Sequence, residues 1–251
     1  MISDAWNIAN DAYADANRRK AIINLLLTIA VIQVWVFDRY NEISLGIEKK
    51  LLQDVGVSMI YLVGVLSALT VAFQIPSELR NKTAMNLFAK PLGRESYLVG
   101  KFMGIGMLAF RNMIFVSIGV LSVLTLSSTQ IQPYHFLKSI LLSYVSVLDV
   151  IAIALILSVF LTEGIVVIAS LLAVYIGNAS YSLSVQEGGM HIVGTALKYI
   201  LPNLNLLDVK IEATAGLTIS ESYMMLACGY GLTYAIMLLS VSVFIIKQKD
   251  L

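Results

Sequence analysis

Charged residues are scarce in this sequence. Asp, Glu, Lys and Arg together make up 13% of its 251 residues, whereas hydrophobic residues make up 58%. A soluble protein of this length needs a charged surface, and this chain has too few charges to form one. Its mean hydropathy of +0.83 is instead typical of a protein that is embedded in a membrane.

Two further shortages narrow the functions open to the chain. The formal net charge is only +1, which argues against the basic face that a nucleic-acid partner requires. The single cysteine, Cys228, can form no intrachain disulfide and no cysteine-based metal cluster. We therefore expect neither nucleic-acid binding nor a metal site.

Long apolar runs are abundant. A membrane-spanning helix needs about 20 mainly apolar residues, and the sequence contains six such stretches. They are continuously apolar rather than alternating, which favours helices over the strands of a barrel. We predict an all-α integral membrane protein that forms one transmembrane domain over residues 1–251. The six predicted spans are Ala21–Phe37, Val55–Phe73, Tyr97–Leu126, Phe136–Leu161, Ile165–Ser182 and Tyr223–Ile246.

The distribution of lysine and arginine predicts the orientation in the membrane. With both termini inside, the inner segments carry ten of the 17 lysine and arginine residues and the outer segments carry six. Positive charge is enriched on the cytoplasmic side of membrane proteins, and Arg18-Arg19-Lys20 directly precedes the first span. We expect a multi-pass protein of the cytoplasmic (inner) membrane with both termini in the cytoplasm.

Residues 1–20 precede the first predicted span and show helical periodicity. Apolar side chains recur at helical spacing along Ser3–Asn17, and three aspartates occupy the other side. The apolar positions are Ile2, Trp6, Ala9, Tyr13 and Ala16. We predict an amphipathic elbow helix in the membrane interface; a frayed polar tail is the alternative.

The inner loop between the second and third spans contains signals for a helix. Ser77 suits a helix N-cap, with Glu78 in the first turn. Lys90-Pro91 ends that helix, because the residue before a proline disfavours helical geometry. We predict a short helix at Glu78–Ala89. Composition alone favours an ordinary basic loop that only sets the topology.

The predicted outer loop, residues 183–222, is long and mostly uncharged. Gly188-Gly189 interrupts it, Ile192–Leu201 has the composition of a short helix, and Pro202 ends that helix. Apolar segments outside a span often dip back into the membrane or cap a cavity. We therefore expect short outer-loop helices between the fifth and sixth spans.

Several short motifs occur in order along the chain. The inner loop contains Glu78, Arg80, Thr83, Lys90-Pro91, Arg94 and Gly100-Lys101-Phe102. Later motifs are Ala152-Ile153-Ala154-Leu155, Leu201-Pro202-Asn203-Leu204 with Asp208, and the basic ending Lys247–Leu251. In these motifs the chain resembles the permease subunits of ATP-binding-cassette (ABC) transporters of the export "type 2" class, including the multicopper-enzyme-maturation permease group. Asn178 departs from a histidine that is common there, which leaves the subfamily open.

The resemblance implies a role and partners. Two permeases pair, as a homodimer or with a related permease, and each docks a separate ABC ATPase subunit through a coupling region at residues 75–96. ATP and Mg then bind the partner, since this chain has no GxxxxGK[ST] phosphate loop. The chain would be a non-catalytic subunit that moves a substrate across the membrane, and no motif identifies that substrate. The residues expected to couple to the ATPase are Glu78, Arg80, Thr83, Leu87, Phe88, Lys90, Pro91 and Arg94.

Two charges and two glycines within the spans are further candidates. Arg111 and Asp149 lie at similar distances from the inner ends of the third and fourth spans, which places both near mid-membrane. Charges buried in a membrane are costly and usually paired. We therefore predict a structural Arg111–Asp149 pair; a substrate or proton site is the alternative. Gly100 and Gly104 have GxxxG spacing, which predicts close helix packing.

Other classes of function fit an apolar multi-span chain less well. A secondary transporter or channel often has broken spans in matching halves, and the sequence has no convincing internal repeat. An intramembrane enzyme needs a convergent catalytic set, which the sequence does not offer. A permease-like subunit that transmits force or regulates a partner without transport would contain the same coupling loop, so this alternative stays open.

Overall fold

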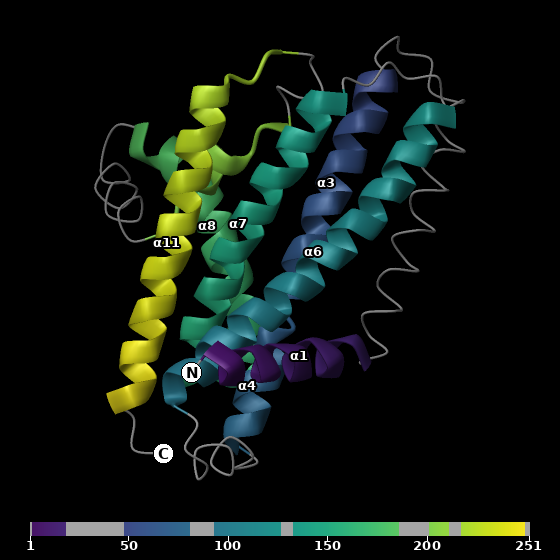
Figure 1. Ribbon diagram of the computed structural model, residues 1–251. Helices are drawn as coiled ribbons and strands as arrows, with labels where there is room; N and C mark the ends of the chain where they lie inside the picture. Colours follow the sequence, from purple (N-terminus) through teal and green to yellow (C-terminus); the bar gives the residue numbers. More distant parts are fainter. Residues whose placement is uncertain are drawn as a thin grey trace.

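The computed structural model of the protein is a bundle of long helices with a shorter helix lying across it (Figure 1). The structure describes residues 2–18, 48–80, 93–126, 133–185, 201–210 and 217–248. These residues are almost entirely helical and contain no strand, which confirms the all-α prediction.

Five long helices among these residues form the bundle. They are α3 (Glu48–Ala68), α6 (Arg94–Leu126), α7 (Pro133–Phe160), α8 (Glu163–Val185) and α11 (Glu221–Gln248). Four described helices are long and apolar enough to cross a membrane: α6, α7, α11, and α3 continued by the short α4 (Val71–Arg80). Helix α8 is apolar over Glu163–Ala179 and shorter than these four. The protein is therefore membrane-embedded, and the first predicted span, Ala21–Phe37, lies outside the described residues.

Charged residues and a proline mark the helix ends. Glu95, Glu163 and Glu221 lie in the first turns of α6, α8 and α11, and Lys247 lies in the last turn of α11. Each side chain complements the partial charge of its helix end. Pro133 is the first residue of α7, where the missing backbone N–H leaves no helical hydrogen bond unmade.

The bundle has two ends, which we call the base and the far end. The base contains the end of α4, the start of α6 and the end of α11 (Figure 1). The far end contains the starts of α3, α7 and α11. Helix α1 (Ile2–Arg18) crosses the bundle near the base.

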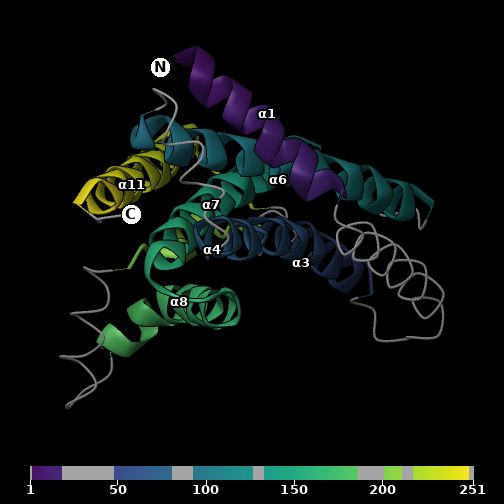
Figure 2. The same cartoon turned by 90° about the horizontal axis from the view of Figure 1, so that it is seen from below.

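Helix α7 is the centre of the bundle. It packs against α3, α4, α6, α8 and α11 (Figure 2). Its central apolar residues are inaccessible to solvent and lipid alike, among them Val147, Val150, Ile151, Ala154 and Leu155. A helix with neighbours on all sides is expected to be apolar all round, and α7 has the highest mean hydropathy of the four candidate spans among the described residues.

Helix α4 continues through Pro76, which corrects the prediction that Ser77 caps a new helix. The Ser77 hydroxyl donates to the backbone carbonyls of Phe73 at 2.6 Å and Gln74 at 2.9 Å. It therefore bonds backwards within α4 and caps nothing. The first turns of α4, including the fully buried Ile75, pack against α7 and α8, and this packing holds the helix together across the proline.

The face of α1 that packs on α6 is lined with small residues. Ala9, Ala12 and Ala16 are fully buried, and Ile8 is nearly so. Trp6, which the periodicity grouped with the apolar face, is 49% exposed. Small side chains let two helix backbones approach closely, so alanines rather than Trp6 form the contact with α6.

Segment 201–210 folds against the far end of the bundle. It contains the short 3-10 helix η1 (Leu204–Leu207), whose two end residues are buried against α7 and α8. The Tyr230 hydroxyl of α11 accepts a hydrogen bond from the backbone N–H of Asn203 at 2.9 Å. The short helix predicted at Ile192–Leu201 lies, except for its last residue, outside the described residues.

Candidate functional site

Two pairs of side chains face each other at the base, on the helices that flank residues 81–92. Gln74 and Glu78 lie one turn apart on α4, and Tyr97 and Lys101 lie one turn apart on α6. The Lys101 ammonium contacts Glu78 Oε1 at 2.5 Å, and the Tyr97 hydroxyl donates to Glu78 Oε2 at 2.7 Å. Lys101 also donates to Gln74 Oε1 at 3.3 Å. We call these four residues the base cluster.

The base cluster is largely removed from solvent. Gln74 and Tyr97 are buried, and the side chains of Lys101 and Glu78 are 6% and 21% exposed. A buried ammonium needs a counter-charge, because an unpaired charge in the interior costs several kcal/mol. The Glu78 carboxylate supplies that charge. The ion pair therefore holds α4 and α6 together immediately before and after residues 81–92.

Further bonds connect the base to two other helices. Gln74 Nε2 donates to the backbone carbonyl of Ala12 in α1 at 3.2 Å. Arg80 Nη2 at the end of α4 contacts Glu163 Oε1 at the start of α8 at 2.8 Å. The second contact is exposed and contributes little stability by itself. Together with the base cluster, these contacts tie α1, α4, α6 and α8 into one unit.

The residues predicted to couple to the ATPase are placed only in part. Glu78 and Arg80 lie in the last turn of α4, and Arg94 is the first residue of α6, so both described ends of the predicted coupling region lie at the base. The sequence analysis did not include Tyr97 and Lys101 of α6 among the site residues. The other predicted contacts lie outside the described residues: Thr83, Leu87, Phe88, Lys90 and Pro91.

Gly100 and Gly104 mark the place where α1 crosses α6. A Cβ atom at Gly100 would lie 2.7 Å from the carbonyl oxygen of Ala5, and one at Gly104 would lie 2.3 Å from that of Ala9. A backbone carbonyl cannot rotate away as a flexible side chain can. The contact between α1 and α6 therefore requires a residue without a Cβ at these two positions.

Arg111 belongs to the same crossing. Its Nη1 donates to the Tyr13 hydroxyl and to Asn17 Oδ1, each at 2.8 Å, and its guanidinium lies 5.2 Å from the Tyr13 ring centroid. Its Nη2 donates to Asn112 Oδ1 at 2.9 Å. The predicted Arg111–Asp149 pair is therefore wrong, because the partners of Arg111 are Tyr13 and Asn17 of α1 and the adjacent Asn112 of α6.

The prediction failed because depth does not decide which way a side chain faces. A Cβ at Gly64 of α3 would contact both Met113 of α6 and Val147 of α7, so the neighbours of Arg111 and Asp149 lie at a similar level in the bundle. The Arg111 side chain faces α1, whereas Asp149 is buried in the bundle interior.

Asp149 lies in the centre of the bundle. It is fully buried, and neither carboxylate oxygen has a hydrogen-bond partner within the described part of the chain. Gly231 of α11 makes room for it, since a Cβ there would lie 3.4 Å from Asp149 Oδ2 and 2.4 Å from Val145 Cγ1. Among the described residues, no hydrogen bond offsets the burial of this carboxyl group.

We expect Asp149→Asn to preserve or raise the stability of the protein, by on the order of 1 kcal/mol, because it removes a buried acid without a partner. Arg111→Gln should instead lower stability by about 1–2 kcal/mol, because it breaks charge-assisted hydrogen bonds to α1. Denaturant unfolding in mixed micelles measures both effects. A loss in Asp149→Asn as large as that in Arg111→Gln would contradict this assignment.

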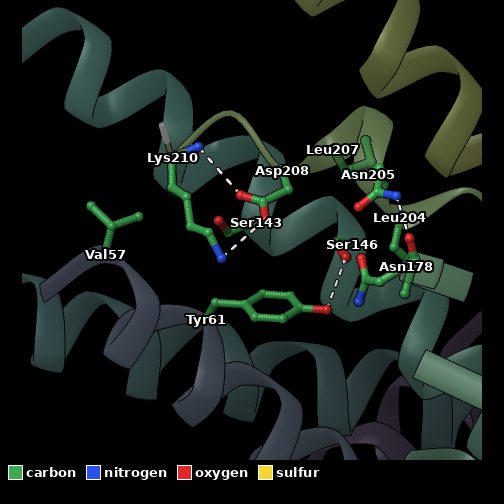
Figure 3. Close-up of a pocket in the computed structure, with 10 residues that line it drawn as sticks. All are labelled: Val57, Tyr61, Ser143, Ser146, Asn178, Leu204, Asn205, Leu207, Asp208 and Lys210. Atoms are coloured by element: carbon green, nitrogen blue, oxygen red, sulfur yellow. Dashed lines mark hydrogen bonds and ion pairs between the residues drawn. The ribbon is translucent and has the colours of Figure 1, made fainter. Parts of the chain in front are cut away.

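A cavity of about 240 Å³ lies at the far end, beside η1 (Figure 3). We call it the η1 cavity. Its polar lining comes from α3, α7, α8 and segment 201–210, and consists of Tyr61, Ser143, Ser146, Asn178, Asn205, Asp208 and Lys210. Ser146 Oγ donates to the Tyr61 hydroxyl oxygen at 3.4 Å across the cavity floor. Sequence analysis did not predict this cavity, because its lining residues come from four separate segments.

The sequence matches no protein-family model, and no curated protein matches it. Within the ranges that the structure describes, no three His, Cys, Asp or Glu side chains gather closely enough to hold a metal ion.

Proposed function

We propose that this chain is the transmembrane permease subunit of an ATP-driven transporter of the ABC type. In this proposal it pairs with a second permease copy, and each copy docks a separate ATPase subunit through residues 75–96. The chain itself is not catalytic, and ATP and Mg bind the partner. The observation that carries the proposal is the base cluster, together with the sequence resemblance in the same region.

A soluble motor can move a membrane helix only through a stiff connection. Residues 81–92 are flanked by Glu78 on one side and by Tyr97 and Lys101 on the other, and these side chains bind one another. A force on the intervening segment therefore acts on α4 and α6 together instead of stretching one loop. The bonds from Gln74 to α1 and from Arg80 to α8 extend this unit to two more helices.

The proposal places the base in the cytoplasm. The Lys/Arg distribution of the sequence supports this orientation, and the C-terminal end of α11 lies at the base. Helix α1 then acts as an elbow at the cytoplasmic interface of the inner membrane. The exposed Trp6 ring on α1 suits that position, since tryptophan is enriched at membrane–water interfaces.

The proposal predicts that apolar contacts dominate ATPase docking. Apolar anchors usually carry more interface energy than charges on the rim. Phe88→Ala should therefore weaken association with the ATPase by at least about tenfold, whereas Lys82→Ala should weaken it by less than about threefold. Affinity purification of the tagged chain from its native membrane, followed by measurement of bound ATPase and its ATP hydrolysis, tests this difference.

Two controls make the result interpretable. Helical circular dichroism and a monodisperse size-exclusion profile show that each variant still folds. If Phe88→Ala and Glu78→Ala both leave ATPase association and stimulated ATP hydrolysis unchanged, the coupling role is wrong.

A further inference from the structure

Both donors and acceptors of hydrogen bonds line the η1 cavity. One amide N–H of Asn178 donates to the backbone carbonyl of Val174 at 3.0 Å, and one amide N–H of Asn205 donates to the backbone carbonyl of Asn178. The two asparagine side chains also carry carbonyl oxygens that can accept hydrogen bonds (Figure 3). The Asp208 carboxylate is the one anionic group among the described residues of the lining. It is therefore the group in this cavity that a cationic ligand would bind.

Lys210 supplies an ammonium group to this lining from within the chain. Its Nζ contacts Asp208 Oδ2 at 3.1 Å, and its backbone N–H donates to Asp208 Oδ1 at 3.3 Å (Figure 3). The Lys210 and Asp208 side chains are 33% and 39% exposed. An ion pair with this much exposure is weak and open to competition from another cation.

We propose that the η1 cavity binds a small molecule through a primary ammonium group, which replaces the Lys210 ammonium at Asp208. Val57, Leu204 and Leu207 form the apolar part of the wall. The volume of about 240 Å³ is below the range of drug-sized sites, so the ligand has a short apolar body. This inference concerns the isolated chain and does not rest on the proposed transport function.

Three probes of nearly identical shape test the charge requirement: 2-phenylethylamine, 2-phenylethanol and 3-phenylpropionate. Isothermal titration calorimetry on the full chain in lipid nanodiscs measures their binding, with empty nanodiscs subtracted to correct for partition into lipid. The amine should bind about two- to fivefold more tightly than the alcohol, because a charge pair at a partly exposed carboxylate adds only modestly to affinity. The carboxylate should show no binding.

Two variants of the cavity should change amine binding in opposite directions. Asp208→Asn should weaken it by about two- to fivefold, because the counter-charge of a partly exposed pair is lost. Lys210→Gln should tighten it by about two- to fivefold, because the internal competitor is removed. A purely structural Asp208–Lys210 pair would give the opposite sign for Lys210→Gln, since loss of either partner would loosen the cavity.

The proposal is overturned if the amine binds no more tightly than the alcohol, if Asp208→Asn leaves amine binding unchanged, or if Lys210→Gln weakens it. The comparison of the three probes uses the unaltered chain and remains decisive if a variant fails to fold. ATPase association is not measured in any of these experiments, so their outcome is independent of the coupling proposal.

Discussion

Glu78→Gln should destabilise the protein by about 3 kcal/mol, the low end of the range for breaking a buried ion pair. The substitution keeps the size of the side chain and removes only the charge. It leaves the Lys101 ammonium, whose side chain is 6% exposed, without its counter-charge. The remaining contacts of Lys101 are the amide oxygen of Gln74 and the ring of Tyr97 at 5.8 Å, and neither carries a compensating charge.

The stability is measured by reversible unfolding in mixed micelles. The double variant Glu78→Gln with Lys101→Met should recover most of the loss, since no unpaired charge then remains in the base cluster. Arg80→Gln is the matched control at the same helix end. Its pair with Glu163 has side chains that are 68% and 30% exposed, so the expected loss is below about 1 kcal/mol. Equal losses for Glu78→Gln and Arg80→Gln would show that the base cluster is not buried as described.

Gly104→Ala should detach α1 from α6 or cost up to about 3 kcal/mol, the upper range for overpacking a tight contact. The added methyl group would lie 2.3 Å from the carbonyl oxygen of Ala9 and 2.9 Å from Ala12 Cβ. Neither atom can move without a shift of the α1 backbone. Loss of the contact would also remove the bonds between Arg111 and α1.

Gly229→Ala on α11 is the matched control, because a Cβ there meets nothing within 4 Å. That change should be neutral or slightly stabilising, since alanine is the better helix former. Labelling of a cysteine placed at the buried Ala12, in a Cys228→Ser background, reports detachment of α1 directly. Slow labelling together with an unchanged unfolding midpoint in Gly104→Ala would refute the close contact.

Much of the helix pattern could be predicted from the sequence. The spans predicted at Tyr97–Leu126, Phe136–Leu161 and Tyr223–Ile246 agree with α6, α7 and α11 to within a few residues at each end. The physical reason is that a backbone in lipid must satisfy its own hydrogen bonds, so a long apolar run has helix as its one stable form. The positions of these helices depend on the length of each apolar run, which can be read directly from the sequence.

The base cluster was predicted only in part. Glu78 was named for contact with a partner, whereas its carboxylate binds Lys101 and Tyr97 within the chain. The one-turn spacing of Tyr97 and Lys101 opposite a similarly spaced pair on α4 was visible in the sequence. Whether these two pairs face each other depends on how α4 and α6 are rotated about their axes. No local sequence pattern contains that rotation.

The sequence by itself therefore determined that the chain lies in a membrane and where most of its helices begin and end. The tertiary structure decided the partners of the polar residues. Arg111 binds the end of α1 and Asp149 has no partner among the described residues, although both were placed at the same depth by counting. Depth follows from the number of residues along a helix, but a contact also requires that two helices approach each other and turn the right faces together. These contacts form only in the folded chain, where alanines and glycines let α1 pack closely on α6 and where segment 201–210 lines the η1 cavity.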